Sequence, residues 1–503
     1  MDQILHTLLS MIEPKIFLSL CTGILAGIVG GAIPGITITM TIILTLPFTF
    51  GMPPLQGLAT MIGVYVGGES GGLVSACLIG IPGTPSAVAT TFDGFPMARK
   101  GQPGRAVWLG IWASFIGGLL AGIPLIFGAV QLANLAMNFG PWEYFSLFIL
   151  TLSIVASLSE LSLVKGLISG VFGLLVTSIG TDPIMAIPRL TFGWEFLRTG
   201  FPFLPILIGV FGLSQIMGDL EKSGAAKGNV GLGLVANLKV SHLAIIREIF
   251  SRPVNLIRST LIGLWIGILP AVGGSAANIL AYDQAKKGSK YPEKFGTGIP
   301  DGIIASESSN NANVGGSLIT MMAFGIPGDA VTAVMLGALI IHGIQPGPLL
   351  FTKTPEAVYT IFVGMMICNL IMIITGLFTA RFFSELMRVP ENILGAFIIT
   401  FCLIGAFALR NDMADVWFMA LFGILGYLMR RYGLPIPPLI LGVILGPLAE
   451  SYFLTTMIAE ANNYWVFFTR PLSGCLMVFS IGLLIMPFIR TLINKGRKKP
   501  AAA

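Results

Sequence analysis

The chain contains 503 residues, of which 54% are hydrophobic and only 10% are charged. Soluble domains carry about 25% charged residues, so this composition excludes a soluble protein and indicates an integral membrane protein. The formal net charge of +6 lies mostly in loops and in the C-terminal tail, where it reports membrane topology and not nucleic-acid binding.

The apolar stretches leave room for about 10 to 12 membrane-spanning helices at about 20 residues each. Apolar and polar residues do not alternate at period two, so helices are predicted in place of a β-barrel. We therefore predict an all-α multi-pass membrane protein with four parts: a first membrane repeat at 16–216, a basic cytoplasmic linker at 217–258, a second membrane repeat at 259–449, and a C-terminal helix with a basic cytoplasmic tail at 450–503.

The two membrane repeats share four landmarks in one order. The pairs are the Gly-Ile-Pro-Gly runs at 80–83 and 325–328, the Gln-Pro-Gly runs at 102–104 and 345–347, the acids in Glu69-Ser70 and Glu307-Ser308, and the helix breaks at Pro34 and Pro270. The shift in numbering lies between 270 − 34 = 236 and 327 − 82 = 245 residues. Four landmarks at nearly one shift indicate an internal duplication.

Charged loops give the two repeats opposite orientations. In the first repeat the early loop at 47–57 has no Lys or Arg, and the late loop carries Arg99, Lys100 and Arg105. In the second repeat the late loop at 343–355 has only Lys353, and the early loop carries Lys286, Lys287, Lys290 and Lys294. Short loops rich in Lys and Arg stay in the cytoplasm, so the bias is reversed. Inverted repeats with Gly/Pro-interrupted segments are typical of secondary transporters that bind substrate near the middle of the membrane.

The apolar segment before each Ile-Pro-Gly run is short. Residues 73–81 and 318–326 form nine-residue stretches, and a helix of that length reaches about 14 Å, less than half of a hydrocarbon core of about 30 Å. We therefore predict a broken helix or a re-entrant hairpin in each repeat. Thr84 and Asp329 are expected to cap the helices that follow.

The start of each of these following helices is predicted to bind an anion. Free N–H groups and the helix dipole favour a carboxylate there, although glycine and proline also occur in membrane helices for packing and kinking alone. The predicted substrate-binding residues are neutral: Gly83, Thr84, Ser86, Asn310, Asn311, Asn313 and Gly328.

Acidic residues inside membrane segments are costly and therefore point to function. Glu69 and Glu307 are flanked by small residues that let backbone carbonyls approach, an oxygen-rich setting that suits Na+. A structural role, with the carboxyl group protonated or bonded to backbone N–H groups, is an equal alternative for both. Asp329 is expected to cap a helix or to bind a cation. The predicted ion-coupling residues are Gly35, Thr37, Glu69, Ser70, Ser306, Glu307 and Asp329, with no metal site beyond Na+.

The remaining chemistry-bearing residues predict no catalysis. Asp93 and Asp301 lie beside the basic loops and are expected to form solvated ion pairs. The chain has only three histidines, no His-Glu-x-x-His pair and no Walker A run, so neither an enzyme nor a bound cofactor is expected. The five cysteines stand alone in apolar sequence and predict neither a disulfide framework nor a metal pair.

Together these motifs resemble the TctA family, the large membrane subunit of bacterial tripartite tricarboxylate transporters. The likeness covers roughly 23–447 and is strongest at 30–35, 67–72, 80–85, 306–316 and 325–330. It implies Na+-coupled secondary import of a di- or tricarboxylate such as citrate across the bacterial inner membrane. It also implies two partners, a small four-helix membrane subunit and a periplasmic substrate-binding protein, and it is compatible with a homo-oligomer.

Energetics favour cation coupling independently of this resemblance. Each negative charge moved inward costs about 2.3 kcal/mol per 100 mV of membrane potential, so a trivalent anion faces about 7 kcal/mol. Net uptake therefore needs co-transported cations. A stand-alone carboxylate or cation exchanger that works without a binding protein is the alternative.

Overall fold

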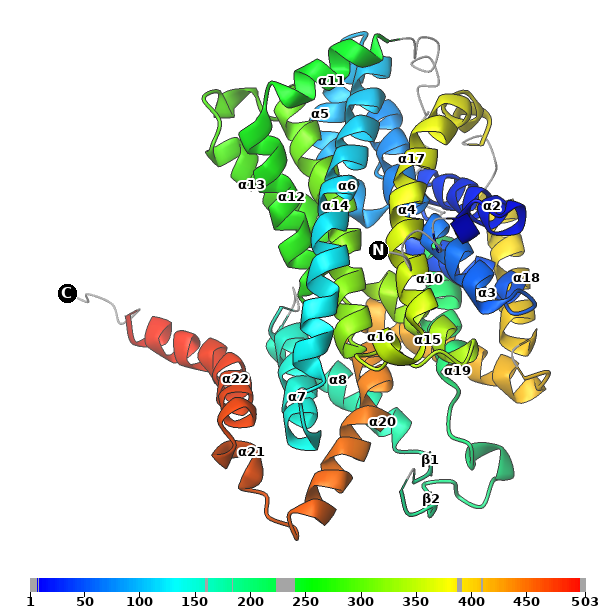
Figure 1. The fold of residues 1–503 in the computed structure, drawn as a ribbon, viewed down its shortest axis with the longest axis vertical. Helices are drawn as coiled ribbons and strands as arrows, with labels where there is room; N and C mark the ends of the chain where they lie inside the picture. The colour runs from blue at the N-terminus through cyan, green and yellow to red at the C-terminus, as the bar shows by residue number, and fades with distance from the viewer. Residues whose placement is uncertain are drawn as a thin grey trace. The chain divides into compact units, whose positions relative to one another are not determined.

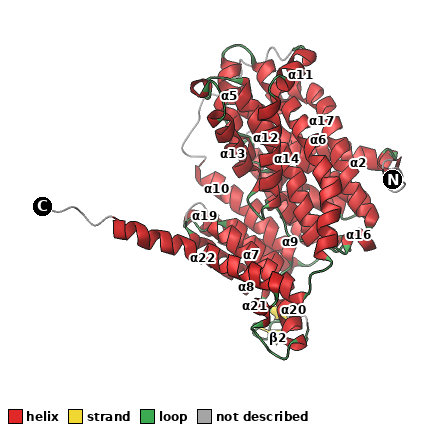
Figure 2. Ribbon diagram, turned by 60° about the vertical axis from the view of Figure 1, so that its left-hand side comes forward, coloured by secondary structure: helices red, strands yellow, loops and turns green. Residues whose placement is uncertain are grey.

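The computed structural model describes residues 7, 9–158, 162–182, 184–222, 240–386, 391–408 and 410–497 (Figure 1). Parts of the predicted linker, 223–239, and of the predicted tail, 498–503, lie outside the described residues. The described chain is almost entirely helical, with one small antiparallel sheet of β1 (Gly180–Thr181) and β2 (Pro188–Arg189) (Figure 2). Within it, seven helices are long and apolar enough to cross a membrane, and shorter apolar helices accompany them. The predicted all-α membrane fold is confirmed.

The chain divides into two compact units. The first comprises Met1–Met137 and Leu207–Gly423, and the second comprises Asn138–Ile206 and Ile424–Ala503. In the second unit aromatic side chains pack the helices, as where Tyr144 stacks on Tyr452 with ring centroids 4.9 Å apart. Besides the small sheet, this unit contains α7 (Pro141–Ser157), α8 (Leu163–Thr177), η2 (Glu195–Leu197), α20 (Ile436–Ala459), α21 (Val466–Thr469) and α22 (Pro471–Arg497). All of the predicted site residues belong to the first unit.

The first unit repeats one series of elements. The first repeat contains α2 (Pro14–Ala32), α3 (Ile38–Thr49), α4 (Pro54–Ile79), η1 (Pro85–Ala87), α5 (Val88–Arg99) and α6 (Pro103–Ala136). The second contains α12 (Pro253–Ile268), α13 (Gly273–Lys287), η5 (Pro292–Lys294), α14 (Pro300–Phe324), α15 (Ala330–Ile341), α16 (Leu350–Lys353) and α17 (Pro355–Leu386). The remaining elements of the first unit are η3 (Ile208–Leu213), α10 (Ser214–Lys222), α11 (His242–Phe250) and α18 (Glu391–Ala408). Helices α9 (Phe203–Leu207) and α19 (Met413–Arg431) each contain residues of both units.

The long helices α4 and α14 end at left-handed glycines. Gly80 has φ 73° and Gly325 has φ 69°, a conformation that glycine adopts without steric cost. Because α4 has 26 residues and α14 has 25, the nine-residue helices predicted before the Ile-Pro-Gly runs are wrong. The glycines within 67–72 do not interrupt α4. They let α2 pack closely, since a Cβ added to Gly71 would lie 2.5 Å from the carbonyl oxygen of Ile28.

After each terminal glycine the chain returns as an extended segment. The N–H group of Gly83 donates to the carbonyl oxygen of Gly72 at 3.3 Å, which brings the chain back to the middle of α4. From there α5 runs beside α4 in the same direction, and its Gly94 lies against Cys77. Each repeat thus contains a re-entrant segment, and its extended backbone is buried in protein, as non-helical backbone at membrane depth requires.

Contacts between the repeats confirm their opposite orientation. At one end, Lys100 after α5 donates to the carbonyl oxygen of Thr297 before α14 at 2.6 Å. At the other end, Gly57 in the first turn of α4 lies against His342, which follows α15. Helices α4 and α14 therefore run antiparallel. The basic loops that were predicted to be cytoplasmic share one end of the unit, which we call the basic end.

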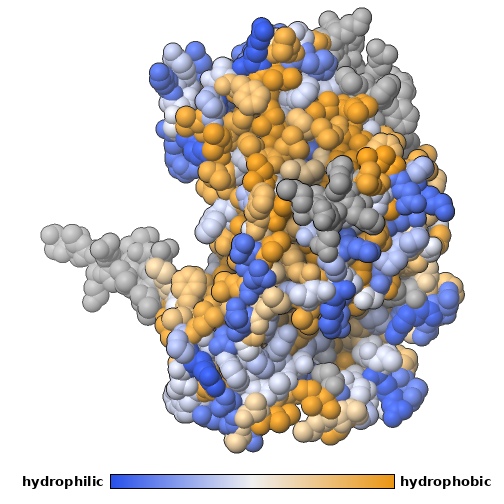
Figure 3. Space-filling view, viewed as in Figure 1, coloured by the Kyte–Doolittle hydropathy of each residue, from blue (hydrophilic) through white to orange (hydrophobic). Residues whose placement is uncertain are grey.

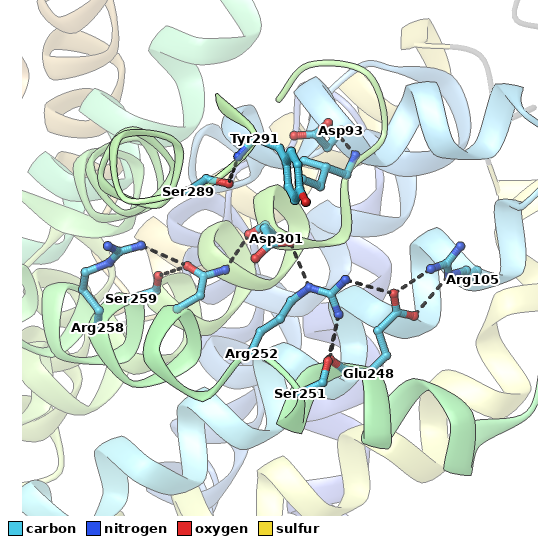
Figure 4. Close-up of polar contacts among 12 residues, drawn as sticks. Asp93, Arg105, Glu248, Ser251, Arg252, Arg258, Ser259, Ser289, Tyr291 and Asp301 are labelled. Atoms are coloured by element: carbon cyan, nitrogen blue, oxygen red, sulfur yellow. Dashed lines mark hydrogen bonds and ion pairs between the residues drawn. The ribbon is translucent and has the colours of Figure 1, made fainter. Parts of the chain in front are cut away.

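A chain of ion pairs lies at the basic end (Figure 4). Arg105 of α6 pairs with Glu248 of α11 at 2.6 Å, and Arg252 pairs with Glu248 at 3.6 Å. Arg252 also pairs with Asp301 of α14 at 2.8 Å, which confirms the ion pair predicted for Asp301. The ionic chain fastens α11 to both repeats.

The ion pair predicted for Asp93 is wrong. Asp93 is fully buried on α5, and its Oδ1 accepts hydrogen bonds from the N–H groups of Gly296, Gly298 and Ile299 at 2.7–3.0 Å. The hydroxyl of Tyr282 donates to Oδ2 at 2.9 Å. Asp93 therefore accepts hydrogen bonds from backbone N–H groups of the basic loop of the second repeat and does not pair with its Lys side chains. The side-chain charges in the sequence did not indicate this contact.

Candidate functional site

The first repeat places two helix N-termini beside the middle of α4. Helix α3 follows the break at Pro34 and begins at Ile38, whose side chain lies against Gly68. The short helix η1, which leads into α5, follows Thr84, and Thr84 lies against Gly72. Both N-termini, with their partial positive charge, therefore lie within one turn of Glu69.

The second repeat places two more N-termini at the same level. Helix α13 begins after the break at Pro270, and a Cβ added to Gly274 would lie 2.8 Å from Asn310 Oδ1 and 3.6 Å from Glu69 Oε1. Helix α15 begins behind Asp329, which lies beside Asn313 of α14. We call the meeting place of the four N-termini the crossover site, made of Glu69, Thr84, Ser86, Asn310, Asn313 and Asp329.

Glu69 joins the two repeats. Its side chain, 2% exposed, accepts a hydrogen bond from Ser86 Oγ at 2.6 Å, and its backbone carbonyl accepts one from the amide of Asn310 at 3.1 Å. Thr84 stands at the N-cap position of η1, but its side chain makes no capping bond. Its hydroxyl lies 3.0 Å from Ser86 Oγ instead, so the capping role predicted for Thr84 is wrong.

Asp329 caps α15, as predicted. Its Oδ1 accepts from the N–H group of Thr332 at 2.8 Å, and the Thr332 hydroxyl accepts from the N–H group of Asp329 at 3.0 Å, which makes a capping box. Its Oδ2 accepts from the Tyr65 hydroxyl and lies 3.4 Å from Ser317 Oγ. Tyr65 was not predicted. Its position four residues before Glu69, on the same face of α4, is the signal that could have found it.

Glu307 lies in a separate cluster. It is fully buried, with Ser114 of α6 donating to one carboxylate oxygen at 2.9 Å and Thr90 of α5 donating to the other. Thr90, which like Ser114 was not predicted, also contacts Ser306 at 3.0 Å. The helix ends fix the shift between α4 and α14 at 325 − 80 = 245 residues, so Glu307 is not the structural counterpart of Glu69. Its satisfied oxygens favour the structural alternative.

Four other predicted residues hold the helices together. Asn311 donates its amide to Ser70 Oγ at 3.1 Å, which joins α14 to α4. A Cβ on Gly83 would clash with a carbonyl oxygen of α2, and a Cβ on Gly328 would clash with one of α12. These glycines let the extended segments lie directly against the helix that precedes each break.

Gly35 and Thr37 lie at the break between α2 and α3. Gly35 has φ 96°, and Thr37 caps α3 by accepting a hydrogen bond from the N–H group of Met40 at 3.2 Å. Within the part of the chain that the structure describes, no side-chain hydrogen bond joins these two residues to the crossover site. Their place in ion coupling stays a prediction.

Two amide oxygens of the crossover site have no hydrogen-bond partner. Asn310 Oδ1 and Asn313 Oδ1 are buried and unpaired, which is unfavourable unless a ligand satisfies them. Asn310 lies beside Glu69, and Asn313 lies beside Asp329. No ion pair with Lys, Arg or His reaches either acid among the described residues. Carboxylate and amide oxygens without a cationic side chain suit a hard cation.

The sequence matches one protein family over most of its length. Residues 17–441 match the tripartite tricarboxylate transporter TctA family. The chain belongs to the TctA family. It is 35% identical over 454 residues, 90% of this chain and 89% of the relative, to an uncharacterised 52.8 kDa protein in the TAR-I ttuC′ 3′ region of Agrobacterium vitis. It is 34% identical over 233 residues, 46% of this chain and 96% of the relative, to an uncharacterised protein in the TAR-II ttuC′ 3′ region of the same organism. No solved structure matches the chain.

Membership in the TctA family indicates the kind of protein in which the crossover site lies. The family is one of transporters, so the chain is a multi-pass membrane subunit of a tricarboxylate transport system, with a carboxylate substrate and partner subunits. The matched residues include the whole crossover site and all of both repeats except the first three residues of α2.

Proposed function

We propose that this TctA-family chain imports a di- or tricarboxylate, such as citrate, together with Na+. The observation that carries the proposal is the crossover site, where four helix N-termini meet two buried acids and two unpaired amide oxygens. In transporters built from inverted repeats, helix N-termini attract anionic substrate groups, and nearby oxygen atoms coordinate the coupling cation. The crossover site offers both kinds of contact.

The substrate would meet the N-termini of η1 and α13. Thr84 and Ser86 supply hydroxyl donors at the first, and Asn310 supplies an amide close to the second. The Ser86 hydroxyl and the Asn310 amide donate to Glu69 in this structure, so the substrate would displace the Ser86 bond and use the second N–H of Asn310. Asn311 contacts Ser70 through both its amide nitrogen and its oxygen, so we place it behind the site. Glu69 and Asp329 would repel a bare carboxylate, and the substrate therefore needs a cation beside it.

Na+ would bind between the acids and the unpaired oxygens. Glu69 and Asn310 Oδ1 form one such pair of ligands, and Asp329 and Asn313 Oδ1 form the other. Binding there neutralises acids that no cationic side chain balances, and it lowers the repulsion that the substrate meets. Each net negative charge moved inward costs about 2.3 kcal/mol per 100 mV. Cations that match the substrate charges remove this cost, and any further cation lets the membrane potential drive uptake.

The family context adds the rest of the system. A periplasmic binding protein would deliver the carboxylate, and a small four-helix membrane subunit would accompany this chain in the bacterial inner membrane. The basic end would face the cytoplasm, since short basic loops stay on that side.

Uptake into proteoliposomes tests the proposal. Labelled citrate would be offered to vesicles that contain this chain and its small partner subunit, with and without binding protein and with an inward gradient of Na+, K+ or protons. We expect uptake only with binding protein and the Na+ gradient. Uptake that ignores the cation gradient would contradict coupling.

The same vesicles test the alternative of a stand-alone exchanger. If vesicles preloaded with carboxylate exchange it at full rate without binding protein, the chain is such an exchanger. If no citrate enters, a panel of di- and tricarboxylates separates a wrong substrate from a wrong mechanism.

A further inference from the structure

We infer that the outer face of α12 and α13 binds an anionic phospholipid of the cytoplasmic leaflet, with the phosphate at Arg258 and an acyl chain along α12. A groove of about 740 Å³ lies on this face. Its lining includes Val254, Ile257, Arg258, Leu261, Trp265 and Leu280. None of these residues belongs to the crossover site.

The groove is apolar and open to the membrane. Val254 is 74% exposed and Trp265 is 67% exposed, while the opposite face of α12 is buried against α14 through Gly263 and Gly267. From Val254 to Trp265 the helix rises about 16 Å, roughly half of a hydrocarbon core of about 30 Å. The groove thus has the depth of a single leaflet, which fits a lipid chain better than a partner helix that crosses the whole bilayer.

Arg258 is the charged residue of the groove. Its Nε atom is buried and unpaired, and its nearest side-chain partner is Asn255 Oδ1 at 3.5 Å. Arg105 and Arg252 both pair with Glu248, but Arg258 forms no ion pair within the described residues and is linked to the ionic chain through Asn255, which donates to the backbone carbonyl of Asp301 (Figure 4). A guanidinium group matches the geometry of a phosphate, so a lipid phosphate supplies the missing anion.

Basic residues near Arg258 add positive charge at the end of the groove where the lipid head group would lie. The guanidinium of Arg258 lies against Gly288, directly after Lys286 and Lys287, and Lys290 follows in the same exposed loop. Figure 3 shows a hydrophilic cap over a hydrophobic surface on this side of the unit. Basic pockets between membrane helices on the cytoplasmic side attract anionic head groups.

A lipid bound there would contact a helix that joins the two repeats. The outer face of α13 carries Leu280 of the groove, and its inner face carries Asn278. Asn278 accepts from the N–H group of Ala89 at 2.7 Å and donates to the carbonyl oxygen of Ser306 at 3.2 Å. A lipid would therefore support the helix that holds the start of α5 against α14.

Lipid binding to the purified, delipidated chain tests the inference. Native mass spectrometry and thermal unfolding in detergent would compare added phosphatidylglycerol with phosphatidylcholine of the same acyl chains. In the wild type we expect tighter binding and a larger rise of the unfolding temperature with phosphatidylglycerol. Arg258→Gln should weaken phosphatidylglycerol binding by about fivefold, the effect of one basic side chain near the surface. Phosphatidylcholine carries the same phosphate together with a choline cation, so its binding should fall by less, and the preference for phosphatidylglycerol should shrink.

Two further variants keep the test decisive. Lys353→Gln removes one exposed positive charge from α16, at the opposite end of the unit, and it should keep the preference for phosphatidylglycerol. Leu261→Trp fills the groove without changing charge and should reduce the binding of both lipids. Equal binding of the two lipids by the wild type, or an Arg258→Gln variant with full preference, would overturn the inference. So would displacement of all bound lipid by the small membrane subunit.

Discussion

Tyr65 of α4 donates its hydroxyl to Asp329, the residue that caps α15. The two residues belong to opposite repeats, so this bond joins the long helix of one repeat to the re-entrant helix of the other. With the shift of 245 residues given by the helix ends, the counterpart of Tyr65 is Asn310, and that of Asp329 is Thr84. The two halves of the crossover site therefore have the same backbone plan but different chemistry, with one acid on α4, Glu69, and the other before α15.

Tyr65→Phe tests whether this bond holds the repeats together. Removal of the hydroxyl leaves Asp329 Oδ2 with two long contacts, to Asn313 at 3.5 Å and Ser317 at 3.4 Å. We expect a loss of about 1.5–3 kcal/mol of unfolding free energy, typical of a hydrogen bond to a charged group, measured by thermal unfolding in detergent. Tyr464→Phe, at an exposed tyrosine, is the control. Equal stability of Tyr65→Phe and the control would show that the bond contributes nothing.

Asn313→Ala tests the unpaired oxygen beside Asp329. If this oxygen binds Na+, its loss should raise the Na+ concentration for half-maximal uptake by about tenfold, equivalent to about 1.4 kcal/mol. Asn369→Ala is a matched control, because Asn369 Oδ1 is also buried and unpaired but its amide bonds only to the backbone of α17 among the described residues. The same Na+ dependence in both variants would rule out a cation ligand at Asn313.

Glu69→Gln and Glu307→Gln separate ion coupling from a structural role. Glu69 has Ser86 on one oxygen and the start of α13 facing the other, whereas hydroxyl groups occupy both oxygens of Glu307. We expect Glu69→Gln to lower Na+-driven uptake by about 100-fold, in line with about 3 kcal/mol for one partner lost from a buried ionic contact. Glu307→Gln should unfold at lower temperature yet keep the Na+ dependence of uptake. If Glu307→Gln abolishes the Na+ dependence of uptake and Glu69→Gln keeps it, the cation binds at Glu307 and not at Glu69.

The sequence predicted the duplication, its inversion and the residues of the crossover site, because these depend on local signals. Loop charges indicate the orientation, and α2 and α12 end just before Pro34 and Pro270, as proline disfavours the continuation of a helix. The length of the helix that ends at Gly80 was not predictable in this way. The nine-residue apolar stretch at 73–81 suggested a short helix, but α4 extends back through the glycines within 67–72. Those glycines pack against α2, a partner that lies about 40 residues away along the sequence.

The hydroxyl groups that donate to Glu307 from other helices could not be predicted from the sequence either. Thr90 and Ser114 lie on α5 and α6 and become partners of Glu307 only in the fold. Their spacing in the sequence follows no motif, and threonine or serine in a membrane helix commonly bonds to its own preceding turn. A buried acid therefore predicts that donors exist somewhere, but it does not say which ones.

Gly83→Ala and Gly328→Ala test the close approach of the extended segments. The added methyl groups would clash with backbone oxygens of α2 and α12, which cannot move as a flexible side chain can. We expect each change to destabilise the protein by about 1–3 kcal/mol, as overpacking does. Gly128→Ala on α6, where an added Cβ meets open space, should be neutral or slightly stabilising. Unfolding temperatures that do not differ between the three variants would contradict the packing role.

Asp93→Ala tests the acid that ties α5 to the loop before α14. The change removes the acceptor of the N–H groups of Gly296, Gly298 and Ile299. A buried unpaired donor costs about 1–3 kcal/mol; Gly298 and Ile299 are partly buried and Gly296 is exposed, so we expect the loss to come mainly from the first two. Asp93→Asn keeps one oxygen for those three donors and should lose less stability than the alanine variant. Asp301→Asn breaks a partly exposed ion pair, so its loss should stay within about 1 kcal/mol. Thermal unfolding and protease cleavage within 288–299 would rank the three variants by their loss of stability. We expect the largest loss in Asp93→Ala, a smaller loss in Asp93→Asn and the smallest in the Asp301→Asn control. An Asp93→Ala variant as stable as the control would show that the loop is held by other contacts.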